Sequence, residues 1–276
     1  MLIRYGYDIT VNCSQPTPIV CFLSVHEDWA ASRRSDERLI TKPEVATSNY
    51  RDQFGNAGLR FVAPAGDFSI WGDGTIEDEG SPDPIFSDAI EIPVEDLPHD
   101  CLVYLLGSRY CETDRLSQIA WDLFGHVSPG WGRVQAICNF VNQHINFSYQ
   151  DADATRTAFE AYQEGVGVCR DYAHLAIALC RCMNIPARYV NGYLGDIGVP
   201  ILDPMDFSAW IEVYLGGRWM TFDPRNNVPR IGRIVVARGR DAVDVPLINS
   251  FGPHVLKSFR VWTYEVTDLP VSSINT

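Results

Sequence analysis

Cys169 lies where a glycine-broken loop, 164–168, meets a stretch with the apolar periodicity of an α-helix. The periodic residues run to Met183, and Pro186 predicts the end of the helix. A cysteine at the start of a helix has its thiolate stabilised by unpaired backbone N–H groups and by the helix dipole, so it can serve as a nucleophile. A buried structural cysteine is the alternative, because most free thiols are buried.

A second group of residues, downstream of Cys169, predicts a β-hairpin. Two alternating, aromatic-rich runs flank Gly216-Gly217, a pair that suits a two-residue loop. In this register Trp210 lies opposite Asp223, and Ser208 shares their face because side chains alternate along a strand. Asp223 is either a site carboxylate or a turn aspartate before proline. Trp210 either lines a substrate cleft or packs within the sheet.

The second half of the chain contains five spaced motifs, namely Gly167–Leu175, Asn184–Val190, Gly192-Tyr193, Ala209-Trp210 and Phe222–Pro224. From roughly residue 131 to residue 266, the chain resembles the transglutaminase-like superfamily. In that family a papain-like core carries a Cys-His-Asp triad, with the cysteine at a helix N-terminus and the other two residues on adjacent strands. The resemblance implies Cys169 as nucleophile and Asp223 as orienting carboxylate. Trp210, which shares a strand face with Asp223, is the candidate substrate-binding residue.

The histidine of this triad precedes an Ala-Trp pair in the family, and here Ser208 occupies that position. The imidazole takes the thiol proton and later protonates the leaving amine, which serine cannot do near neutral pH. The resemblance therefore implies a bacterial cysteine peptidase or amidase that acts through a Cys169 thioester on a peptide or protein amide, impaired at Ser208. The lack of a calcium-loop motif favours hydrolysis over cross-linking. The alternative is a non-catalytic protein- or peptide-binding module on the same fold, and the sequence identifies no substitute base.

Composition narrows the remaining function classes. The 276 residues are 46% hydrophobic and 21% charged, as in an ordinary globular protein. The net charge of −13 disfavours binding to nucleic acid or to anionic membranes. No stretch approaches the ~20 apolar residues of a membrane helix, and the opening residues lack a long apolar segment, so we expect a cytoplasmic protein. The eight cysteines lack zinc-site spacing and no nucleotide-binding motif is present, so we expect neither a metal nor a cofactor.

The expected fold class is α+β, with a papain-like, transglutaminase-like core preceded by an antiparallel β-rich domain. Residues 1–98 are assigned to the β-rich domain, because short alternating runs are separated there by turn residues. Residues 99–276 are assigned to the core. Helices are expected at 114–124 and from Pro129 to Ile145, and a strand is expected at 257–266.

Overall fold

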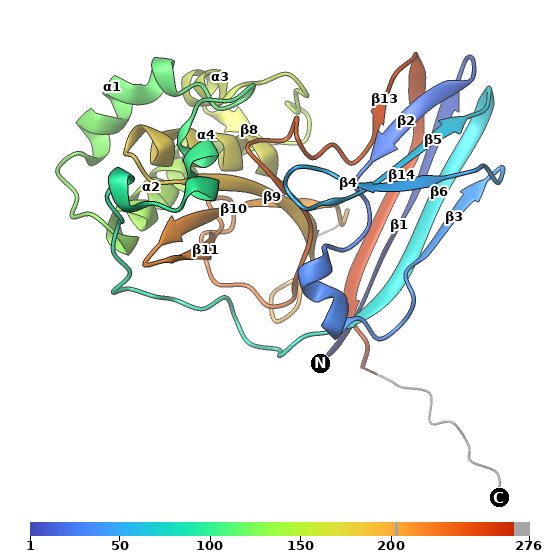
Figure 1. Cartoon of the computed structure of the whole chain (residues 1–276), viewed down its shortest axis with the longest axis horizontal. Coiled ribbons are helices and arrows are strands. Elements are labelled where there is room, and N and C mark those ends of the chain that lie inside the picture. The colour runs from blue at the N-terminus through green and yellow to red at the C-terminus, as the bar shows by residue number, and fades with distance from the viewer. Residues whose placement is uncertain (202–203, 268–276) are drawn as a thin grey trace, which may run out of the picture.

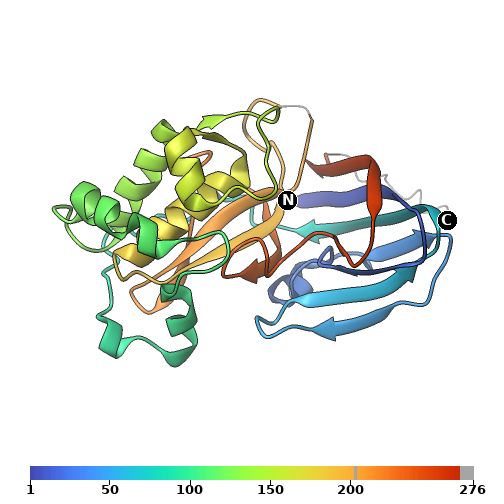
Figure 2. The same cartoon turned by 90° about the horizontal axis from the view of Figure 1, so that it is seen from above.

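The computed structural model describes residues 1–201 and 204–267. It consists of a β-rich unit and a helical unit that lie side by side (Figures 1 and 2). Antiparallel sheets form the first unit, and helices cover a further antiparallel sheet in the second. The predicted α+β class is confirmed.

Two four-stranded sheets build the β-rich unit, with strand orders β14-β1-β6-β3 and β13-β2-β5-β4. They pack face to face, and the rings of Phe61 and Phe68 are 5.2 Å apart between them. The predicted alternation of the first strand is borne out, since Ile3, Tyr5 and Ile9 are all buried. The strands from the N-terminal part of the chain are β1 (Leu2–Cys13), β2 (Thr17–Cys21), β3 (Arg38–Lys42), β4 (Ser48–Arg51), β5 (Ala57–Ala63) and β6 (Gly66–Glu77).

Two strands from the far end of the described chain complete these sheets. They are β13 (Asn249–Ser250), which pairs with β2, and β14 (His254–Glu265), which pairs with β1 along its length. Both strands belong to the range 99–276 that was assigned to the core, and they pair with strands from the range 1–98. The physical reason is the long edge of β1, whose backbone N–H and C=O groups β14 satisfies.

The helical unit is centred on α4 (Cys169–Cys182), which α1, α2 and α3 surround. Its sheet has the order β11-β10-β9-β12, and α4 packs across β9 and β10. The predicted helices are present, and their first and last residues lie within two residues of the predicted ones. The remaining elements are α1 (Thr113–Phe124), α2 (Trp131–His144), β7 (Asn146–Phe147), α3 (Ala158–Glu164), β8 (Val166–Gly167), β9 (Ala187–Leu194), β10 (Ser208–Leu215), β11 (Arg218–Phe222) and β12 (Arg233–Gly239).

The predicted hairpin has the expected register, with Leu215 opposite Arg218. Both loop glycines, Gly216 and Gly217, have positive φ, as a tight turn between right-twisted strands requires. Ala209, Ile211 and Val213 of β10 join the main core, to which α4 also belongs, whereas Trp210 joins a separate small cluster. The two faces of this strand thus have different surroundings.

Aromatic rings join the two units. Tyr5 of β1 lies 5.1 Å from Tyr193 of β9, and Tyr193 lies 4.7 Å from Phe207. Phe207 also contacts the ring of Tyr7 at 6.3 Å. Because Phe207 directly precedes β10, this interface holds the start of the strand that carries Ser208. Within the described ranges, no helix combines the length and apolarity needed to cross a bilayer.

Candidate active site

Cys169 is the first residue of α4, as predicted. The preceding chain is tightly held. Gly165 ends α3 with a φ of 63°, and the carboxylate of Asp171 accepts a hydrogen bond from the Val168 N–H at 2.8 Å. This bond satisfies one of the free N–H groups at the start of the helix. The local sequence therefore fixes where the thiol emerges.

The Cys169 sulfur lies beside the start of β10, where the backbone N–H of Ala209 hydrogen-bonds to it. Burial raises the pKa of this thiol to about 11, and the carboxylates of Asp206 and Asp223 contribute in the same direction. The guanidinium of Arg225 and the Ala209 N–H oppose the shift but do not outweigh it. The expected stabilisation of the thiolate at the helix N-terminus is therefore overcome by desolvation and nearby negative charge.

Ser208 is buried at the first position of β10 and lines a small hollow of about 60 Å³. Asp206, Arg225 and Tyr149 line the same hollow. Burial raises the pKa of Asp206, although the Phe207 N–H and the Arg225 guanidinium favour its charged form. Two of these hollow-lining groups, Asp206 and Arg225, also act electrostatically on the Cys169 thiol, so the hollow lies near the thiol.

Asp223 directly follows β11 and is buried. Its carboxylate accepts hydrogen bonds from Asn226 Nδ2 and from Arg233 Nη2, each at 2.8 Å. Burial alone would raise the pKa of Asp223, but the charge of Arg233 and the bonds from Asn226 outweigh it and lower the pKa. Asp223 is thus a carboxylate held in a buried ion pair, and Arg233 bonds to one of its oxygens.

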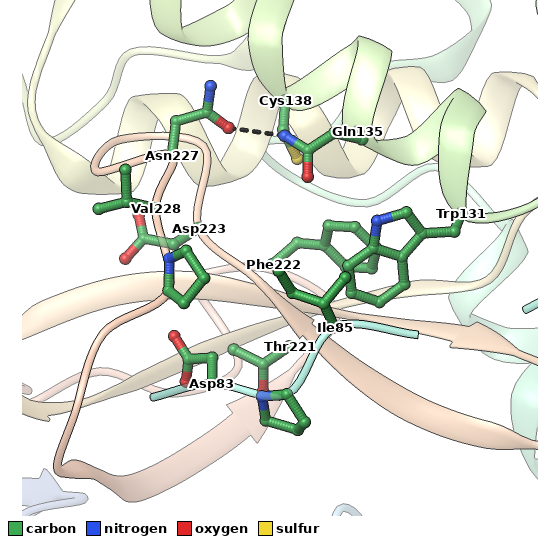
Figure 3. A pocket seen from close by; sticks show the side chains of 12 residues that line it. Asp83, Ile85, Trp131, Gln135, Cys138, Thr221, Phe222, Asp223, Asn227 and Val228 are labelled. Atoms are coloured by element: carbon green, nitrogen blue, oxygen red, sulfur yellow. Dashed lines mark hydrogen bonds between the residues drawn. The ribbon is translucent and has the colours of Figure 1, made fainter. Parts of the chain in front are cut away.

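The loop after Asp223 is clamped by α2. Asn142 donates to the carbonyl oxygens of Pro224 and Arg225, and Gln135 donates to Asn227 Oδ1 at 2.9 Å. Figure 3 shows this last bond above a cavity of about 80 Å³ that Asp223 and Trp131 border. The clamp fixes Arg225 at the site, where its guanidinium lies 4.1 Å from the centroid of the Phe147 ring.

Trp210 is buried against Val190 and Val235. It borders a hollow of about 450 Å³ that also includes Trp29 and Arg233, and it does not line the hollow beside Ser208. The structure therefore brings Cys169, Ser208 and Asp223 to one region and places Trp210 within the sheet packing.

None of the six histidines, all of them in the described ranges, faces Cys169 in a recorded contact. His174 is fully buried, accepts from the Ala242 N–H at 3.1 Å and stacks on Tyr110. His144 bonds to the Tyr162 carbonyl and stacks on that ring. The other four histidines lie elsewhere. His26 contacts Arg238, His254 hydrogen-bonds to Ser250, and His99 and His126 are exposed.

Sequence reasoning missed Asp206 and Arg225. A signal for both exists in their spacing, since Asp206 lies two residues before Ser208 and Arg225 two residues after Asp223. The spacing becomes informative only when the hairpin and the helix N-terminus are brought together.

Comparisons with known proteins agree with this geometry. Residues 118–224, which include Cys169, Ser208 and Asp223, match the model of the Transglutaminase-like superfamily. A crystal structure of a "Putative Cysteine Protease" from Cytophaga hutchinsonii is 31% identical and superposes with a TM-score of 0.85, covering 98% of this chain and 92% of that one.

Two curated relatives are uncharacterized mycobacterial proteins. The protein of Mycobacterium leprae is 39% identical over 93 residues, which is 32% of this chain and 33% of the relative. The protein of Mycobacterium tuberculosis strain H37Rv is 37% identical over 115 residues, or 37% of each chain. The match therefore spans only about a third of the length of these relatives.

A cysteine at a helix N-terminus facing a β-hairpin, inside a mixed α+β core, defines a protein of the papain-like class. Within it, this chain belongs to the transglutaminase-like superfamily.

Proposed function

We propose that this chain is a cysteine hydrolase that cleaves peptide or protein amides, and activated esters faster, through a thioester at Cys169. The observation that carries the proposal is the exposure of this residue. The other seven cysteines are buried, whereas Cys169 is partly exposed at the start of α4 beside the hollow. The similarity to the "Putative Cysteine Protease" from Cytophaga hutchinsonii supports the same chemistry.

The rate of amide cleavage is limited by the residues around the thiol. An amine leaving group needs a proton, and Ser208 stands where the superfamily has its imidazole. A p-nitrophenyl ester needs no such proton, because its leaving group is stable as an anion. We therefore expect this protein to react with activated esters faster than it cleaves amides.

The test compares the unmodified protein with Cys169→Ala on p-nitrophenyl acetate and on fluorescein-labelled casein. We expect the unmodified protein to release p-nitrophenol and to gain an acetyl group detectable by intact mass. Cys169→Ala should lower the ester rate at least about 100-fold, because the nucleophile is gone. Cys182→Ala, which removes a buried thiol at the other end of the same helix, is the matched control.

A non-catalytic binding module is the second candidate. The ion pair between Asp223 and Arg233 favours it, because the carboxylate that would orient an imidazole is already engaged. If the unmodified protein and Cys169→Ala have the same rate on the ester and the same rate on casein, and no acetylated species forms, the binding module is selected and hydrolysis is rejected.

A further inference from the structure

The ionisable groups around the Cys169 thiol are few. The thiol senses the charges of Arg225, Asp206 and Asp223, and the hydroxyls of Tyr149 and Tyr189 in turn sense Cys169. None of these groups is an imidazole. Any proton that leaves the sulfur must therefore pass to one of these side chains or to water.

Four of these groups are poor proton acceptors for the thiol. Arg225 carries its proton at all relevant pH values. Asp223 is held by Arg233 and Asn226, and this pairing lowers its pKa. Burial raises the pKa of Tyr149 and of Tyr189, so both hydroxyls stay protonated.

Asp206 differs from Asp223 in its partners and in the direction of its pKa shift. It has no salt bridge within residues 1–201 and 204–267, where only the adjacent Phe207 N–H is recorded as a hydrogen-bond donor to it. Its carboxyl lines the hollow together with Ser208, which directly precedes Ala209, the residue whose backbone N–H bonds to the Cys169 sulfur. Desolvation raises its pKa toward the working range of a general acid–base.

Resting on the function proposed above, we propose that Asp206 is the general acid–base of this site and substitutes for the absent imidazole. In acylation its carboxylate takes the proton from Cys169 Sγ as the sulfur bonds to the substrate carbonyl carbon. The carboxyl then gives that proton to the leaving nitrogen as the C–N bond breaks, which leaves a thioester and a free amine.

Deacylation uses the same carboxyl group, with water as the nucleophile and the sulfur as the leaving group. The Asp206 carboxylate takes a proton from water as the water oxygen attacks the thioester carbon. The C–S bond breaks, and the carboxyl returns the proton to the sulfur. Each half-reaction conserves the proton, and water is the only additional reactant.

The experiment measures Asp206→Asn against the unmodified protein on the same two substrates. Casein cleavage should fall about 100-fold, in the range that general acid–base groups contribute. Ester acylation should also fall, but by a clearly smaller factor, because p-nitrophenolate leaves without a proton and only the removal of the thiol proton is lost. Alkylation of Cys169 by iodoacetamide at pH 8 should not slow, because removing a nearby negative charge favours the thiolate. Asp206→Glu should recover part of the casein activity.

Repeating Asp206→Asn in a protein that also carries Ser208→His separates a loss of catalysis from structural damage. An imidazole at residue 208 can take over the proton transfer, so Asp206→Asn should then cost less than about threefold on casein. Asp151→Asn, which removes an exposed carboxylate of the same unit, is the matched control. An equal loss from Asp206→Asn with and without Ser208→His would overturn the proposal.

Failure of this inference is distinguishable from failure of the proposed function. Cys169-dependent casein cleavage that survives Asp206→Asn would refute the role of Asp206 alone. Absence of any Cys169-dependent ester or amide reaction would refute the hydrolase itself, and with it the acid–base role.

Discussion

The thiol of Cys169 combines features that usually occur separately. It begins a helix, which favours a thiolate, and it is desolvated among carboxylates, which disfavours one. Burial prevails, so the sulfur remains a thiol at neutral pH. Nucleophilic attack therefore depends on removal of the proton during the reaction.

This balance predicts the pH dependence of alkylation. With a pKa of about 11, the thiolate fraction of Cys169 increases about tenfold per pH unit, since the pH stays below the pKa. We expect the iodoacetamide rate at Cys169, followed by peptide mass spectrometry, to rise in this way from pH 7 to pH 10. A small-molecule thiol of ordinary pKa should level off near the top of this interval, and Cys169→Ala provides the background. A plateau for Cys169 below pH 8 would show that the helix N-terminus dominates instead.

At the scale of elements, the end of β11 and the start of β12 are joined by charge. Arg233 of β12 bonds to Asp223 at 2.8 Å and to Asp83, in the segment after β6, at 2.9 Å. The ion pairs are buried, so their loss leaves a charge without a partner in a poorly solvated place. They tie together the hairpin, its neighbouring sheet edge and the connection between the two units.

Asp223→Asn tests this link. We expect a loss of about 3 kcal/mol in the free energy of unfolding at pH 7, because Arg233 keeps its charge and loses one carboxylate. The folded-state pKa of Asp223 lies below its unfolded value, so its contribution is complete above the unfolded value of about 3.9 and disappears as the pH falls through the folded value. Urea unfolding at pH 7 and pH 3 should thus show a smaller difference between variant and unmodified protein at pH 3. Asp151→Asn is the control, and an equally stable Asp223→Asn at pH 7 would contradict the expectation.

At the scale of the whole molecule, the β-rich unit takes part in positioning the site. Phe207 packs against Tyr7 of β1, Phe259 of β14 and Tyr193 of β9, and it is flanked in the chain by Asp206 and Ser208. Strands from both ends of the described chain therefore hold the segment that carries Asp206 and Ser208. We infer that the two units unfold together and not independently.

Phe207→Ala tests this coupling. Removing the ring should lower the free energy of unfolding by about 3 kcal/mol, as for other buried aromatic residues, and should slow ester acylation at Cys169. Urea unfolding followed by tryptophan fluorescence should remain a single transition for the unmodified protein. Phe251→Ala, at a residue that is 64% exposed, is the matched control. Unchanged acylation in a destabilised Phe207→Ala would show that the β-rich unit supports the core without shaping its site.

The sequence by itself determined the features that depend on local periodicity. It predicted the helix that begins at Cys169, the register of the hairpin around Gly216-Gly217 and the superfamily of the core, because helix and strand patterns repeat over a few residues. Residue 208 was identified as the departure from the family pattern by the same local comparison.

Only the tertiary structure decided what surrounds these residues. Three features depend on groups that come from distant segments and are removed from water. They are the ion pair between Asp223 and Arg233, the position of Asp206 in the hollow and the raised pKa of Cys169. The return of β14 to β1 likewise joins strands some 250 residues apart, which no local pattern specifies. Partner choice and desolvation are properties of the packed chain, and they decide which side chains can exchange a proton with the thiol.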